Sequence, residues 1–81
     1  MSGADRLAGI TLPPKVRKCV DQHLGGIERA QAGDEVRRWL DRAQSLIEGL
    51  EAAGALNAST IEALYIHFDD VALARLAELG G

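Results

Sequence analysis

Apolar residues recur every three or four positions along most of the chain, which is the spacing of one face of an α-helix. Short segments with glycine or helix-capping residues separate three such stretches. The pattern predicts helices over about residues 14–31, 35–53 and 60–79. No strand is expected, because the β-branched residues are scattered and never alternate. Three amphipathic helices with short connections predict an all-α, small antiparallel three-helix bundle.

The first predicted helix opens at Pro13-Pro14, because proline suits a first helical turn, where its missing N–H needs no partner. Its apolar face stays in phase across Gly25-Gly26, so we interpret the glycines as a weak point inside one helix. Each costs about 1 kcal/mol relative to alanine. Two short helices divided at the glycines are the alternative. Residues 1–12 are predicted to form a flexible N-terminal arm and residues 13–81 a single helical domain.

Capping residues set the ends of the second and third predicted helices. Asp34 is expected to be the N-cap of the second helix, and Gly54 its left-handed C-terminal cap. Ser59 and Glu62 have the spacing of a capping box, in which each side chain satisfies a backbone N–H of the other residue. The third helix is therefore expected to start just after Ser59.

The third predicted helix is apolar on two sides. Its main stripe runs unbroken past Asp69-Asp70, which favours one helix over two helices divided at these aspartates. Ile66 and Leu73 form a second stripe, about 120–140° from the first at about 100° per residue. Either the neighbouring helices cover both stripes, or Ile66 and Leu73 are exposed and contact another chain. A homodimer is predicted, since small helical proteins often need a second copy for stability.

Charge divides the chain unequally. Up to residue 42 there are eight Lys or Arg and six Asp or Glu, whereas the remainder holds one base, Arg75, and six acids. The surplus acids lie at the end of the second helix and on the third, the helix that also carries the second apolar stripe. An acidic and apolar helix predicts contact with a basic surface of a protein partner. The predicted partner-binding residues are Trp39, Glu62, Ile66, Asp69, Asp70 and Leu73.

The function expected from these features is a small non-catalytic regulatory protein that occupies a partner surface. One alternative is an inhibitor, encoded by a mobile element, that blocks the basic surface of a nucleic-acid-binding host enzyme; size and acidity alone suggest it. The other alternative is a nucleic-acid-binding regulator, but interleaved acids dilute the field of the bases in the first two helices. Nucleic acid is therefore the less favoured partner. The bases in question are Lys15, Arg17, Lys18, Arg38 and Arg42.

Candidate catalytic and metal-binding residues are few. Cys19 and His23 lie one helical turn apart and could supply two zinc ligands, but nothing nearby supplies the other two. Both are expected to pack structurally instead, the cysteine as a small hydrophobic residue. Asp69 and Asp70 point about 100° apart and do not converge on one atom. The sequence therefore predicts no enzyme, no metal and no cofactor, and Trp39 is either a partial core residue or an interface anchor.

Cellular location is argued from two features. The single cysteine cannot form an intrachain disulfide, which fits a reducing compartment. No apolar run reaches the roughly 20 residues that span a bilayer, and the first ten residues lack the apolar segment of a signal peptide. A cytoplasmic protein without membrane contact is expected.

Overall fold

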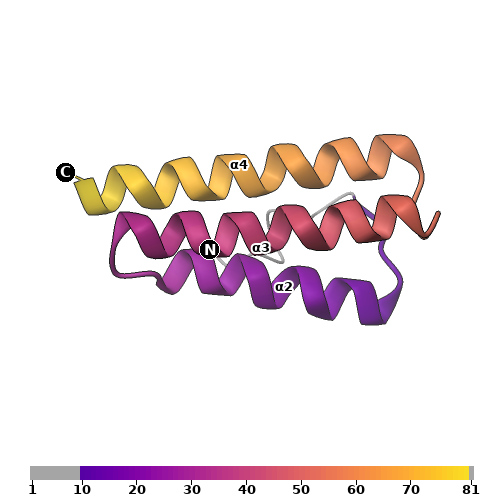
Figure 1. Cartoon of the computed structure of the whole chain (residues 1–81), viewed down its shortest axis with the longest axis horizontal. Coiled ribbons are helices and arrows are strands. Elements are labelled where there is room, and N and C mark those ends of the chain that lie inside the picture. Colours follow the sequence, from indigo (N-terminus) through magenta and orange to yellow (C-terminus); the bar gives the residue numbers. More distant parts are fainter. Residues whose placement is uncertain (1–9, 81) are drawn as a thin grey trace.

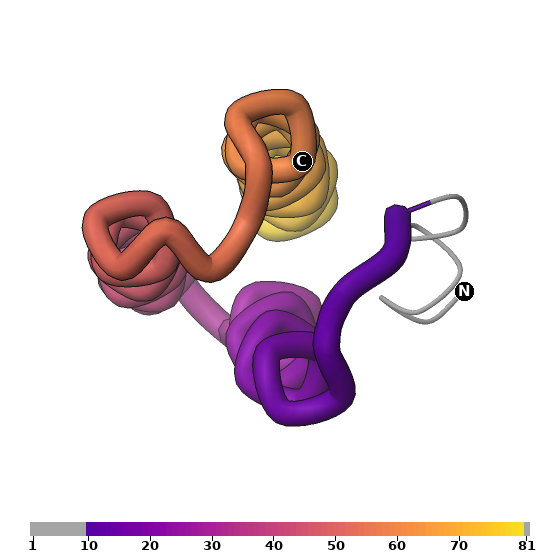
Figure 2. The backbone as a smooth tube through the Cα atoms, turned by 90° about the vertical axis from the view of Figure 1, so that its right-hand side faces the viewer, coloured from indigo at the N-terminus to yellow at the C-terminus, as the bar shows by residue number. Residues whose placement is uncertain are grey.

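The computed structural model describes residues 10–80, which form three α-helices in the order α2 (Pro14–Arg29), α3 (Gly33–Ala52) and α4 (Ala58–Gly80). Consecutive helices run in opposite directions (Figure 1), and the end-on view places them at the corners of a triangle (Figure 2). No strand occurs in this described part of the chain. The predicted all-α antiparallel three-helix bundle is confirmed. The two continuous helices predicted across Gly25-Gly26 and Asp69-Asp70 are confirmed as well.

The core is one apolar cluster between the three helices. Phe68 is its only aromatic member and is fully buried. Among the described residues no polar or charged side chain is classed as buried, so the core itself is held by non-directional apolar packing. The buried members are Val20, Leu24, Ile27, Ala30, Val36, Ala43, Ile47, Ile61, Leu64, Phe68, Val71 and Ala72.

The predicted N-terminal arm lies outside the described residues as far as residue 9. Its last part packs on the bundle, because Ile10 and Leu12 are half-buried against the core. In Figure 2 this segment leaves α2 on the side away from α3. Ile10 and Thr11 line a small depression together with Asn57, just before α4, and Ala63 in the first turns of α4.

The start of α3 differs from the prediction. The N-cap is Ala32, with extended backbone and no side-chain cap, so the assignment of Asp34 as N-cap is wrong. Asp34 lies in the first turn and accepts a hydrogen bond from Arg38 at 3.3 Å. Glu35 in the same turn accepts the backbone N–H of Gln31 at 3.3 Å. Both carboxylates also suit the positive end of the helix dipole, which explains why the turn forms without a capping side chain.

The start of α4 also differs. The Oδ1 atom of Asn57 accepts the backbone N–H of Thr60 at 2.8 Å and the hydroxyl of Ser59 at 3.1 Å. Asn57 is therefore the cap, α4 begins at Ala58, and the predicted capping box of Ser59 and Glu62 is wrong. Asparagine caps helices as well as serine does. Asn57 comes two residues before Ser59, and its side chain accepts the free N–H of the first turn of α4.

The ends of α3 and α2 use different devices. Gly54, at φ 66°, donates its N–H to the carbonyl of Glu51, and Ala55 donates to Leu50, both at 3.0 Å. This pair of bonds is a Schellman motif, so the predicted glycine cap is confirmed. At the end of α2, the carbonyl of Ala30 instead accepts hydrogen bonds from Arg75 of α4, at 2.9 Å from Nε and 2.7 Å from Nη2.

Candidate functional site

The second apolar stripe of α4 is exposed. Ile66 is 53% exposed and Leu73 is 65% exposed, and no other large apolar side chain in the described residues is classed as exposed. The alternative in which neighbouring helices cover both stripes is therefore excluded.

Acidic side chains surround this exposed pair. Ile66 and Leu73 are two helical turns apart, about 10 Å along the axis. Asp69 and Asp70 lie halfway between them, about 50° to either side of the line that joins them. Glu62 lies one turn before Ile66, and all five side chains are exposed. We call Glu62, Ile66, Asp69, Asp70 and Leu73 the acidic–apolar face.

The carboxylates of the acidic–apolar face are uncompensated. The side chains of Glu62, Asp69 and Asp70 form no hydrogen bond or ion pair with any residue that the structure describes. Arg75, the only Lys or Arg of α4, is turned toward α2, where it donates to the carbonyl of Ala30, and it also lies 3.6 Å from Glu78. The face therefore presents negative charge to solvent around two apolar side chains.

Negative charge continues onto the neighbouring edge of α3. Partial loss of solvent raises the pKa of Tyr65 above its ordinary value of 10.0, and the carboxylates of Glu48 and Glu51 raise it further. The two glutamates belong to the last turns of α3. Tyr65 precedes Ile66 in α4, so these acids extend the negative region beside the acidic–apolar face.

Trp39 lies at a different place, where α3 packs on α2. A methyl group at Gly26 of α2 would come within 2.3 Å of the indole ring, so the ring rests directly on the α2 backbone. The His23 ring meets it edge-on at 5.8 Å, and the Arg42 guanidinium lies 5.3 Å from its centroid. Trp39 is half-buried against the core and is not brought together with the other five predicted partner-binding residues. A role for it in partner binding stays a prediction.

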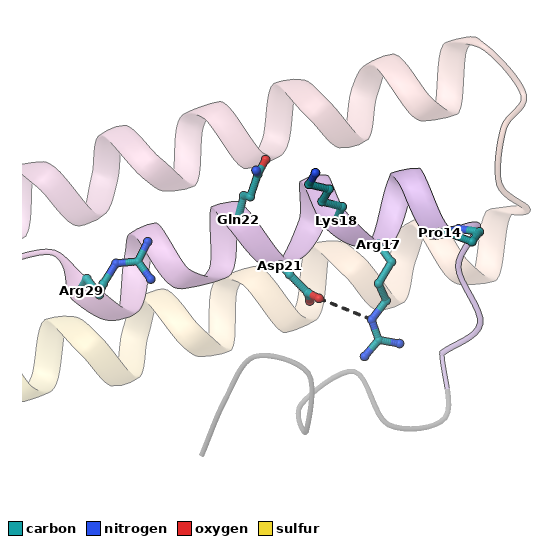
Figure 3. A pocket seen from close by; sticks show the side chains of 6 residues that line it. All are labelled: Pro14, Arg17, Lys18, Asp21, Gln22 and Arg29. Atoms are coloured by element: carbon teal, nitrogen blue, oxygen red, sulfur yellow. Dashed lines mark ion pairs between the residues drawn. The ribbon is translucent and has the colours of Figure 1, made fainter.

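The bases of the first two helices do not form one continuous strip. Arg17, Lys18 and Arg29 line an open depression of about 530 Å³ on α2, where Arg17 Nε lies 3.7 Å from Asp21 (Figure 3). The figure shows Arg17 and Asp21 pointing to one side of α2 and Lys18 to the other. On α3, Arg38 pairs with Asp34 and Arg42 lies over Trp39. Acids and an aromatic ring thus interrupt the bases that were candidates for phosphate contacts.

Cys19 and His23 are placed side by side on α2. Cys19 is exposed, so its expected packing as a buried hydrophobic residue is wrong. The Nδ1 atom of His23 donates to the carbonyl oxygen of Cys19 at 2.7 Å, and this bond holds the ring against the helix. Within residues 10–80, no three His, Cys, Asp or Glu side chains are close enough together to hold a metal ion.

The fold and the exposed face define a small antiparallel three-helix bundle with one acidic and apolar helix surface. No protein-family model matches the chain, and no curated protein or solved structure is significantly similar to it. None of the helices in residues 10–80 combines the length and the apolar character needed to cross a membrane.

Proposed function

We propose that the protein is a small non-catalytic regulatory protein that covers a basic surface of a protein partner with its acidic–apolar face. The observation that carries the proposal is the exposure of Ile66 and Leu73. Single exposed apolar residues are common on protein surfaces. Here two large ones are aligned on one helix face, while all the others described are buried or half-buried. Such a face is typical of a surface that another molecule covers.

The energy available from the apolar pair is modest. Burying the exposed part of Ile66 and Leu73 stabilises a complex by about 2–3 kcal/mol in total, since full burial of such a side chain contributes about 1.5–3 kcal/mol. This is far below the roughly 8 kcal/mol of a micromolar complex. The carboxylates therefore matter, because they steer a basic partner to the face and disfavour other surfaces. Binding through this face is expected to weaken with salt.

Two occupants follow from the sequence, a basic partner and a second copy of the chain. The uncompensated charge of Glu62, Asp69 and Asp70 favours the basic partner. Blocking the basic surface of a nucleic-acid-binding enzyme is one form that such regulation would take. The homodimer expected from the small size of the chain is the competing occupant.

Photo-crosslinking in the cells that produce the protein tests the proposal. The photoreactive residue p-benzoylphenylalanine replaces Ile66 or Leu73 in separate variants, and replaces Ser45, exposed on α3, as the matched control. We expect one partner to crosslink from both α4 positions and not from position 45. Adding Asp69→Lys and Asp70→Lys should suppress the adduct. Equal labelling from position 45, or no adduct from either α4 position, would contradict the proposal.

A further inference from the structure

We propose that the acidic–apolar face docks one amphipathic helix of its partner, with two apolar residues seven positions apart and Lys or Arg between them. The same charge pattern turns away a second copy of the chain. This inference rests on the proposed function and deepens it, because it names the chemistry of the partner and the register of the contact. Three features of the face support it: the alignment of its two apolar side chains along α4, the positions of its carboxylates, and the contacts that these carboxylates would make in a two-fold dimer.

The spacing of Ile66 and Leu73 along α4 fits the side-chain spacing of a second helix that lies beside it. Ile66 and Leu73 are separated by two turns, about 10 Å along the axis, and point in directions that differ by only about 20°. A second helix that runs beside α4 presents side chains at the same two-turn spacing. Its apolar residues at positions i and i+7 then meet Ile66 and Leu73 together. An amphipathic helix lying against an apolar helix face is a recurring mode of peptide recognition.

The charges specify what lies between those two apolar residues. Asp69 and Asp70 flank the midpoint of the line on opposite sides, and neither is paired in the described structure. A partner that covers the apolar pair also removes water from these carboxylates, which is unfavourable unless a cation replaces it. Lys or Arg near positions i+3 and i+4 of the partner supplies that cation. Glu62 favours a further base on the partner, one turn outside the apolar residue that meets Ile66.

The same positions of the aspartates disfavour a homodimer through this face. In an antiparallel two-fold contact, Ile66 faces Leu73 of the second copy, and the axis passes between positions 69 and 70. Asp69 and Asp70 of both copies then gather at the axis, four carboxylates without a base. In a parallel contact, Asp69 of each copy lies beside Asp70 of the other. Like charges brought together in this way disfavour a partner, so the face selects a basic helix over a second copy.

Two designed helical peptides test the inference on the full chain. Both carry leucine at two positions seven apart, and they differ only in having lysine or glutamate at the positions between and one turn beyond. Nuclear magnetic resonance titrations at low salt compare their affinities. We expect the lysine peptide to bind about tenfold more tightly, as two or three exposed ion pairs imply. Its shift changes should centre on α4, and Ile66→Ser with Leu73→Ser should weaken both peptides.

Charge reversal separates a specific contact from general attraction. Asp69→Lys with Asp70→Lys should switch the preference to the glutamate peptide, whereas Asp34→Lys with Asp41→Lys, both exposed on α3, is the control and should leave the lysine peptide preferred. Equal binding of both peptides would overturn the charge selection but leave the docking face of the proposed function intact. Binding of neither peptide would overturn the helical partner, while the crosslinking experiment judges the proposed function independently.

Sedimentation measures the exclusion of a second copy. The unaltered chain should remain monomeric, and Asp69→Asn with Asp70→Asn should increase self-association. A dimer of the unaltered chain that Leu73→Ser dissociates would overturn this part of the inference.

Discussion

Arg75 in α4 donates two hydrogen bonds to the carbonyl oxygen of Ala30, at 2.9 Å from Nε and 2.7 Å from Nη2. Ala30 is the C-cap of α2, so the bonds join two helices through residues 45 positions apart in the chain. A cation also suits the negative end of the α2 dipole. The contact has a second effect, because it turns the only Lys or Arg of α4 away from the acidic–apolar face.

Replacing Arg75 tests this contact. Arg75→Met keeps the length of the side chain but removes its donors, and should lower the free energy of unfolding by about 1.5–3 kcal/mol, the range for hydrogen bonds to charged groups. Arg75→Lys should recover part of the loss. The ion pair with Glu78, which is 67% exposed, should contribute little, so Glu78→Gln is the control. Urea denaturation measures all three. A loss in Glu78→Gln equal to that in Arg75→Met would assign the effect to the ion pair.

The adjacent glycines of α2 should respond oppositely to alanine. At Gly26 a new Cβ would come within 2.3 Å of the Trp39 ring, and at Gly25 it would meet only the mobile end of Arg29 at 2.8 Å. Gly25→Ala should stabilise the fold by up to about 1 kcal/mol through helix propensity. Gly26→Ala should destabilise it by about 1 kcal/mol or more, because overpacking outweighs that gain.

A double variant checks the cause of the Gly26 effect. Trp39→Leu removes the ring that the new methyl group would strike. The cost of Gly26→Ala should therefore shrink or reverse in the Trp39→Leu background, a coupling that thermal denaturation of the four proteins resolves. Simple additivity of the two substitutions would show that the close approach to Trp39 is not the reason.

Asn57, and not the Ser59 that the sequence pattern suggests, is expected to stabilise the start of α4. Asn57→Ala should cost about 1 kcal/mol of stability, because the Thr60 N–H loses its acceptor. Ser59→Ala should be nearly neutral, since the Ser59 hydroxyl only donates to Asn57. Chemical denaturation of both variants decides between the two capping residues. A larger loss for Ser59→Ala would restore the capping box that the sequence predicts.

Tyr65 should titrate at higher pH than a free tyrosine. Partial loss of solvent and the carboxylates of Glu48 and Glu51 raise its pKa above 10.0. The folded state thus favours the neutral phenol, and this contribution to stability is fully present below pH 10 and disappears as the pH rises through the folded pKa. Glu48→Gln should move the pKa back toward 10.0. Tyrosinate absorbance follows this directly because Tyr65 is the only tyrosine. Titration at the free-tyrosine value would contradict the prediction.

Apolar periodicity was enough to predict the three helices, their direction and the second stripe of α4. It left open whether Ile66 and Leu73 are covered, because the period of one helix does not say where its neighbours pack. The helix starts were misplaced because several residues in a row, such as Asn57 and Ser59, are good caps, and the choice depends on backbone geometry. The contact of Arg75 with Ala30 joins distant segments and leaves no local pattern.

The position of Trp39 makes it a spectroscopic marker for one pair of helices. Its ring rests on Gly26 and beside His23, so its fluorescence depends on α2 remaining against α3. The only tyrosine, Tyr65, lies instead where α4 approaches Glu48 and Glu51 of α3. The chain therefore carries one natural chromophore for each side of α3. Loss of α2 and loss of α4 can be followed separately, without attaching a label to the face proposed to bind a partner.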